Sequence, residues 1–177
     1  DRAPEHVADG GWFVELTPLR AGDDPSETLA AALELREQSM LRTPTATPQT
    51  LTVERVTAFL GGRDVLLVLD NCEHLLDDVA PFVGLLLARC PRLRVLATSR
   101  EPLGVPGERL VPVPPLALPE PGVDAFEAGA YPAVTLFTER ARAVRPDFTI
   151  TSDNVEHVVR VVRELDGMPL ALELAAA

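Results

Sequence analysis

The sequence predicts an α/β protein in which a parallel, doubly wound sheet is followed by a smaller helical subdomain. Two strongly apolar runs, at 64–69 and 92–100, read as buried strands that end in polar residues. Helical patterns separate the predicted strands along the chain, as they do in parallel sheets. Beyond residue 121 the patterns are helical throughout. We therefore expect an α/β core over 1–121 and a helical subdomain over 122–177.

The predicted strands are recognised by short apolar runs rich in aromatic and β-branched residues. "GWFVEL" opens the series and is followed by the turn signals of "TPLRAGDDP". The run "VLLVL" has no polar alternation, which is typical of a strand covered on both faces. In chain order the predicted strands are 11–16, 64–69, 92–100 and a short one at about 109–113.

The predicted helices of the first half follow from apolar residues at helical spacing and from start and stop signals. Ser26 is a candidate cap for the first of them, and Gly61–Gly62 is a stop signal for the second. The third carries one continuous apolar stripe. In chain order these helices are 24–35, 50–60 and about 77–89, with a loop predicted over 39–49.

The second half begins with a proline-rich connection and a predicted linker over 116–131. Pro132 suits the first turn of a helix, and Ser152 or Asp153 can cap the next one. We expect three helices here, at 132–144, 152–165 and 169–177. No internal repeat is visible.

Composition excludes several classes of function. The net charge is −11, and no cluster of cations resembles a nucleic-acid or acidic-membrane surface. All sixteen cations are arginines, so no lysine can form a Schiff base or neutralise phosphates in a phosphate-binding loop. Cys72 and Cys90 match no metal-ligand spacing and suit a reducing compartment. No signal peptide or membrane span is recognisable, so we expect a cytoplasmic protein.

Reactive and polar side chains follow the strand at 64–69, in "DNCEH". Asp70 could hold a Mg²⁺ ion that bridges nucleotide phosphates, or it could cap the following helix. Glu73 could polarise a water molecule, or it could be a first-turn acid facing the helix dipole. His74 is more simply a loop residue than a base. Cys72 suits packing better than nucleophilic attack.

A second polar cluster, "TSR", ends the strand at 92–100. Thr98, Ser99 and Arg100 could hydrogen-bond a terminal phosphate, or Arg100 could pair with an exposed carboxylate. Ligands of open parallel sheets gather beyond the carboxyl ends of the strands. We therefore expect this cluster and "DNCEH" to lie over the same edge of the sheet.

Three segments taken together resemble a known family. "LLVLDNCEHL", "LRVLATSREPLGVPGE" and "GMPLALELAA" are similar, in this order, to motifs of the NB-ARC branch of the STAND signalling ATPases. They look most like the version in large bacterial transcriptional regulators of the SARP and large LuxR types. The resemblance implies a P-loop-NTPase-like three-layer sheet, bound ATP or ADP with Mg²⁺, and DNA-binding and tetratricopeptide domains in the same polypeptide. A homo-oligomer is a further implied partner.

The resemblance also implies roles for single residues. Asp70 matches the metal-binding acid of the Walker B motif, and Thr98, Ser99 and Arg100 match the sensor-1 segment. In the third motif Gly167 would shape a turn and Pro169 would lie against the adenine, although a plain helix start explains both residues equally well.

Two departures from the family pattern bear on activity. Asn71 stands where many such ATPases have a second acid, which makes slow hydrolysis the expectation even if Glu73 substitutes as catalytic base. The family's phosphate loop and the strand before it are missing, so we expect an excised part of a longer protein. Such a part should bind nucleotide weakly or not at all, and should be unstable, self-associating or repacked.

The expected function is therefore part of an ATP/ADP switch that regulates a transcriptional activator. An interaction scaffold that keeps the fold without a ligand is the main alternative, and a hydrolytic enzyme using Glu73 is a third.

Overall fold

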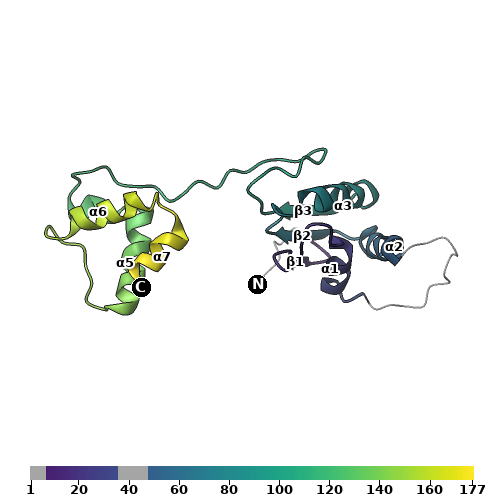
Figure 1. The fold of residues 1–177 in the computed structure, drawn as a ribbon, viewed down its shortest axis with the longest axis horizontal. Helices are drawn as coiled ribbons and strands as arrows, with labels where there is room; N and C mark the ends of the chain where they lie inside the picture. The colour runs from purple at the N-terminus through teal and green to yellow at the C-terminus, as the bar shows by residue number, and fades with distance from the viewer. Residues whose placement is uncertain (1–6, 36–47) are drawn as a thin grey trace. The chain divides into compact units, whose positions relative to one another are not determined.

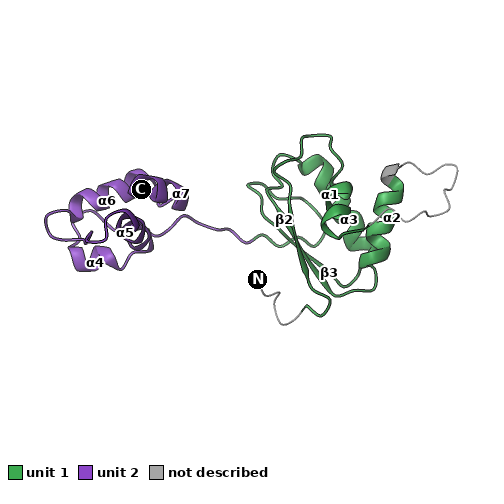
Figure 2. Ribbon diagram, turned by 90° about the horizontal axis from the view of Figure 1, so that it is seen from below, with its two compact units in different colours: residues 1–110 green, residues 111–177 purple. Residues whose placement is uncertain are grey.

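The computed structural model describes residues 7–35 and 48–177, which fall into two compact units, 1–110 and 111–177 (Figure 2). The division comes earlier in the chain than the boundary after residue 121 that the sequence suggested. The loop expected at 39–49 and the start of the chain lie largely outside the described residues.

The first unit is built on a three-stranded parallel sheet in the order β1-β2-β3. Gly11 pairs with Leu66 across β1 and β2, and Val65 pairs with Leu93 across β2 and β3. The parallel α/β class is therefore confirmed. The strands are β1 (Gly11–Glu15), β2 (Val65–Asp70) and β3 (Leu93–Ala97).

Three helices connect these strands: α1 (Pro25–Ala32), α2 (Pro48–Leu60) and α3 (Leu76–Arg89). All three lie on the same side of the sheet (Figures 1 and 2). The cap of α1 differs from the expectation, because the Asp24 carboxylate accepts the Ser26 N–H at 2.9 Å. Ser26 itself is fully buried in the first turn.

Among the described residues of the first unit, helices cover only one face of the sheet, which corrects the expectation that the strand at 64–69 is covered on both faces. Exposure alternates along β2, where Val65, Leu67 and Leu69 are buried and the residues between them are partly exposed. On the open face Phe13 is 62% and Leu96 55% exposed. The described part of this unit therefore has two layers rather than three. The sequence did not predict this asymmetry, because β2 carries apolar residues on both of its faces.

The core of the first unit lies between the covered face and the helices. Val56 and Leu60 of α2 and Val79, Val83 and Leu86 of α3 are essentially inaccessible to solvent. Burying one such side chain contributes roughly 1.5–3 kcal/mol to stability. This packing holds the covered face of the sheet against the helices of the first unit.

No strand forms at about 109–113, where one was predicted. Leu110, Val111 and Val113 are 60–90% exposed. Prolines at 112, 114 and 115 lack the N–H that a sheet ladder requires. The alternation of apolar residues in this segment is therefore that of an extended connection.

The second unit consists of four helices: α4 (Ala125–Gly129), α5 (Pro132–Val144), α6 (Val155–Glu164) and α7 (Pro169–Ala176). The last three were expected, and Pro132 does open α5. Part of the predicted linker instead forms α4, which Asp124 caps by accepting the Glu127 N–H. Neither Ser152 nor Asp153 caps α6. Asn154 occupies that position, and its side chain bonds the backbone of Thr149 and Thr151.

Candidate functional site

The two predicted polar clusters meet where β2 and β3 end. Backbone hydrogen bonds join the ends, from Thr98 N to Leu69 O at 2.9 Å and from Cys72 N to Thr98 O at 3.0 Å. Adjacent parallel strands present their carboxyl ends at one edge, as the sequence argument assumed. The expected meeting of "DNCEH" and "TSR" is therefore observed.

Thr98 lies at the centre of this edge. Its hydroxyl donates to Asp70 Oδ1 at 2.6 Å and accepts the Asn71 N–H at 2.9 Å. Asn71 has a left-handed backbone, with φ +65°, a conformation that Asn tolerates better than most residues. The hydroxyl thus orients the Asp70 carboxylate and stabilises the turn that follows it.

Arg100 and Glu73 form an ion pair at the same edge, with Arg100 Nε 2.9 Å from Glu73 Oε1. The Arg100 side chain is 85% exposed, whereas that of Glu73 is only 17% exposed. A hydrogen bond from its own backbone N–H, and then the bond from Arg100, lower the pKa of the Glu73 carboxyl. Glu73 is therefore a carboxylate at neutral pH, and a weakly basic one.

A third contact, through His74, was missed by the sequence reading. Asn71 Nδ2 lies 3.3 Å from His74 Nδ1, and His74 Nε2 lies 3.0 Å from the carbonyl oxygen of Leu19. A carbonyl only accepts, so the neutral imidazole with its proton on Nε2 satisfies both contacts. The ring connects the β2 end to the loop after β1. The i, i+3 spacing of Asn71 and His74 was the available signal.

The remaining strand-end residues have local roles. Ser99 Oγ accepts the Glu101 N–H at 3.2 Å, which fixes the turn around Arg100. Cys72 is fully buried, and burial, followed by the charges of Glu73 and Asp70, raises the pKa of its thiol to about 11. Such a thiol is protonated at neutral pH and packs as a small apolar group.

Gly167 and Pro169 belong to the second unit. Gly167 is buried with φ +65°, and a Cβ there would lie 2.3 Å from Leu116 O. Its own carbonyl accepts the Leu116 N–H at 3.0 Å. Pro169 is exposed at the first turn of α7. Gly167 thus shapes a turn, as expected, and the adenine contact of Pro169 stays a prediction.

The carboxylates at the strand ends suit a metal ion that arrives bound to a nucleotide better than one held by protein side chains alone. The described residues contain no group of three or more His, Cys, Asp or Glu side chains that could enclose an ion. Nucleotide-bound Mg²⁺ takes one or two carboxylates and completes its shell with phosphates and water. Asp70, with one oxygen held by Thr98, fits that pattern and does not fit an all-protein metal centre.

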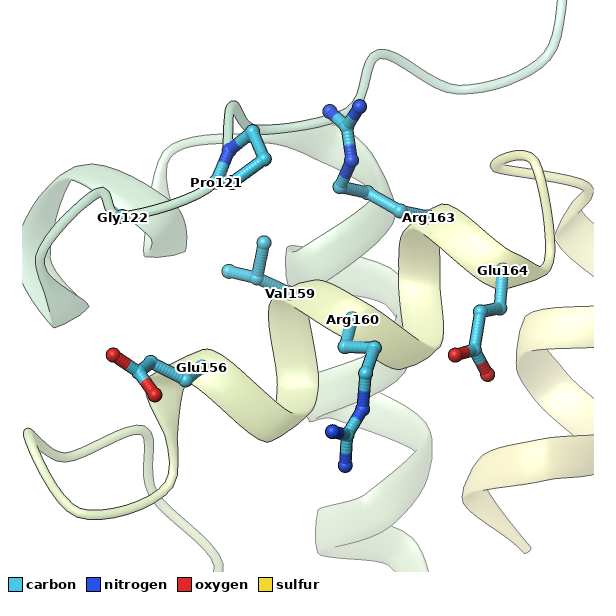
Figure 3. A pocket seen from close by; sticks show the side chains of 7 residues that line it. All are labelled: Pro121, Gly122, Glu156, Val159, Arg160, Arg163 and Glu164. Atoms are coloured by element: carbon cyan, nitrogen blue, oxygen red, sulfur yellow. The ribbon is translucent and has the colours of Figure 1, made fainter.

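Two surface hollows lie away from this edge. One, of about 420 Å³, is in the first unit and is lined by residues of α1, α2 and α3 together with the loop before α1. The other, of about 580 Å³, lies in the second unit between α6 and the Pro121–Gly122 segment (Figure 3). There Arg163 extends toward that segment, and it donates to Pro119 O at 2.8 Å, while Arg160 points the other way. Neither hollow is lined by Asp70 or Arg100.

Within the ranges the structure describes, no helix combines the length and apolar character needed to cross a membrane.

The chain is similar to segments of longer mycobacterial proteins. The chain is 41% identical over 171 residues to a protein of Mycobacterium tuberculosis (strain H37Rv) named as a predicted HTH-type transcriptional regulator, and equally to one of Mycobacterium bovis. These matches cover 97% of this chain but 17% of each regulator. An uncharacterized M. tuberculosis protein is 40% identical over 168 residues, which is 95% of this chain and 38% of that protein. No family model and no solved structure matches.

Proposed function

We propose that this chain is part of an ATP/ADP-binding switch that regulates a bacterial transcriptional activator. The observation that carries the proposal is the meeting of Asp70, Thr98, Glu73 and Arg100 at the ends of two adjacent parallel strands. The similarity to predicted HTH-type regulators supports the regulatory context. The chain spans about a sixth of those regulators, so DNA-binding and other domains would come from elsewhere in such a polypeptide.

Each strand-end residue has a distinct task in this proposal. Arg100 carries a charge that can bind a terminal phosphate, and Thr98 holds the Asp70 carboxylate toward the open end of the sheet. Bound Mg²⁺ would neutralise phosphate charge beside Asp70. Ser99 and Asn71 would add hydroxyl and amide groups at the rim. Gly167 would shape the turn that presents Pro169 to the adenine, as the family resemblance implies.

A nucleotide can switch this module only if ATP and ADP bind its two states with different affinity. The γ-phosphate is the sole chemical difference, so the cation nearest the terminal phosphate has to sense it. Arg100 is the candidate because its side chain is largely exposed and long enough to change partner. We propose tight nucleotide holding with slow turnover, because the lowered pKa of Glu73 makes it a weak base.

Calorimetric titration of Mg-ATP and Mg-ADP tests the proposal on two polypeptides. One is this chain, and the other carries about 40 additional upstream residues, the length of one βα unit with a phosphate loop. We expect binding by the longer polypeptide and its loss in Asp70→Ala and Arg100→Ala. Glu101→Ala, one residue beyond Arg100, is the matched control and should retain affinity. Absence of binding to the longer polypeptide would refute the switch.

A ligand-free interaction scaffold is the second candidate. It is favoured by the absence of lysine, by Asn71 in place of a second acid, and by an Arg100 that already has a protein partner. The same titration separates the two functions, because a scaffold binds neither nucleotide in either polypeptide.

A further inference from the structure

Arg100 is the cation that a bound phosphate would contact, and in this structure it is already paired with the Glu73 carboxylate. Arg100 Nε donates to Glu73 Oε1 at 2.9 Å, whereas Asp70 is held by the Thr98 hydroxyl. Of Asp70 and Glu73, Glu73 is therefore the carboxylate that competes with an incoming phosphate oxygen for Arg100. Both partners are charged, so the exchange swaps one charge-assisted hydrogen bond for another.

The two partners differ in how far they can move. The Glu73 side chain is only 17% exposed, while the Arg100 side chain is 85% exposed. The backbone around Arg100 is fixed by the bond from Glu101 N to Ser99 Oγ. The fixed member is thus the acid, and the member free to swing is the arginine side chain.

We propose that Glu73 is the resident counter-ion of Arg100, which phosphate binding displaces, and that it sets the affinity of the site rather than acting as a base. This inference rests on the proposed nucleotide site and specifies its control. Asp70, Glu73 and Arg100 together carry one net negative charge, so this group of residues favours magnesium-complexed phosphates over free ones. Glu73 is accordingly a positioning residue. It keeps the Arg100 side chain ordered, and it lowers the affinity of the site for phosphate.

The test is an NMR titration of the longer polypeptide, the one with about 40 additional upstream residues, with Mg-tripolyphosphate, observing the Arg100 Nε–H resonance. In the unliganded polypeptide that resonance should be shifted and protected by Glu73, and it should move as ligand is added. In Glu73→Gln, before ligand is added, the Arg100 Nε–H resonance should have the chemical shift of an unpaired arginine. The dissociation constant for Mg-tripolyphosphate should fall by about fivefold in this variant. Glu101→Gln removes the same charge nearby without touching Arg100, and should change affinity less than twofold.

The outcomes separate this inference from the function on which it rests. Saturable binding that is abolished by Arg100→Ala but equal in the unaltered longer polypeptide and in Glu73→Gln would overturn the counter-ion role and leave the nucleotide site standing. An equal gain in Glu101→Gln would also overturn it, since general charge would then explain the effect. If neither the unaltered longer polypeptide nor its Glu73→Gln variant shows saturable binding, the phosphate site itself is refuted, and the inference with it.

Discussion

At the scale of single residues, the Thr98 hydroxyl determines the geometry of the strand ends. It donates to the Asp70 carboxylate and also accepts the Asn71 backbone N–H. An apolar residue of the same shape would leave Asp70 free to rotate and Asn71 without its acceptor. The orientation of the proposed metal-binding carboxylate therefore depends on the Thr98 hydroxyl as well as on Asp70 itself.

Thr98→Val should therefore lower the free energy of unfolding of the first unit by about 1 kcal/mol, because it removes two hydrogen bonds at a partly solvated position. Thr98→Ser keeps the hydroxyl and should lose less than half as much. Urea unfolding followed by circular dichroism measures both. A loss in Thr98→Ser as large as that in Thr98→Val would contradict this expectation, because the methyl group would then matter as much as the hydroxyl.

Cys72 should be inert in the folded chain. With a pKa of about 11, roughly one thiol in a thousand is ionised at pH 8, and the side chain is inaccessible. Because the thiolate is the reactive form, alkylation by iodoacetamide should speed up as pH rises toward 11 and should be fast at pH 8 only after unfolding. Mass spectrometry of Cys90→Ala, which leaves Cys72 as the only thiol, gives the rate. Rapid labelling of the native protein at pH 8 would contradict its burial.

Local sequence predicted part of this site. The strand-end rule placed Asp70 near Thr98, and the contact is direct. The pairing of Arg100 with Glu73 depends on the length and direction of two side chains from different strand ends, which spacing along the chain does not encode. The link from His74 to Leu19 O joins segments 55 residues apart and was missed for the same reason.

At the scale of elements, periodicity located the helices better than it located their ends. The continuous apolar stripe of α3 leaves no alternative to a helix, whereas caps depend on which of several neighbouring polar side chains reaches a free N–H. Asp24 and Asn154 occupy cap positions for which Ser26, Ser152 and Asp153 were proposed. The segment at 109–113 failed as a strand because Pro112, and the prolines at 114 and 115 just after it, remove ladder donors.

The turn between α6 and α7 requires glycine at position 167. A Cβ there would meet Leu116 O at 2.3 Å, and the backbone is left-handed. Gly167→Ala should destabilise the second unit by about 3 kcal/mol, since backbone has to shift. Gly129→Ala, in the same unit with open space around it, should be neutral or stabilising by up to about 1 kcal/mol. Thermal unfolding of both variants tests this, and similar melting temperatures would refute the clash.

At the scale of the whole molecule, the two units have separate cores, and the sheet of the first unit has an open apolar face. The first core lies under α1, α2 and α3, and the second includes Val134, Val162 and Leu172. On the first unit the open face of the sheet presents Phe13 and Leu96, and β3 is an edge strand. Fold class was predictable because it depends on local pattern, but the coverage of each face depends on segments distant in sequence.

The open face should make the isolated chain self-associate, because exposed apolar surface of this kind favours contact with another molecule. Sedimentation velocity should show a concentration-dependent increase in mass, and the double variant Phe13→Thr, Leu96→Thr should reduce it. Phe126→Thr is the matched control, since Phe126 is 93% exposed but lies in the second unit. A monomer that melts cooperatively at all concentrations would contradict this expectation.

The most direct test of the central claim is to locate nucleotide on the molecule by NMR. Amide shifts of the longer polypeptide would be mapped during titration with Mg-ATP and again after chelation of Mg²⁺ by EDTA. The account predicts saturable, magnesium-dependent shifts at the strand ends, in Asn71, Glu73, Ser99 and Arg100. Shifts confined to the hollow beside α6, or no shifts at all, would contradict it.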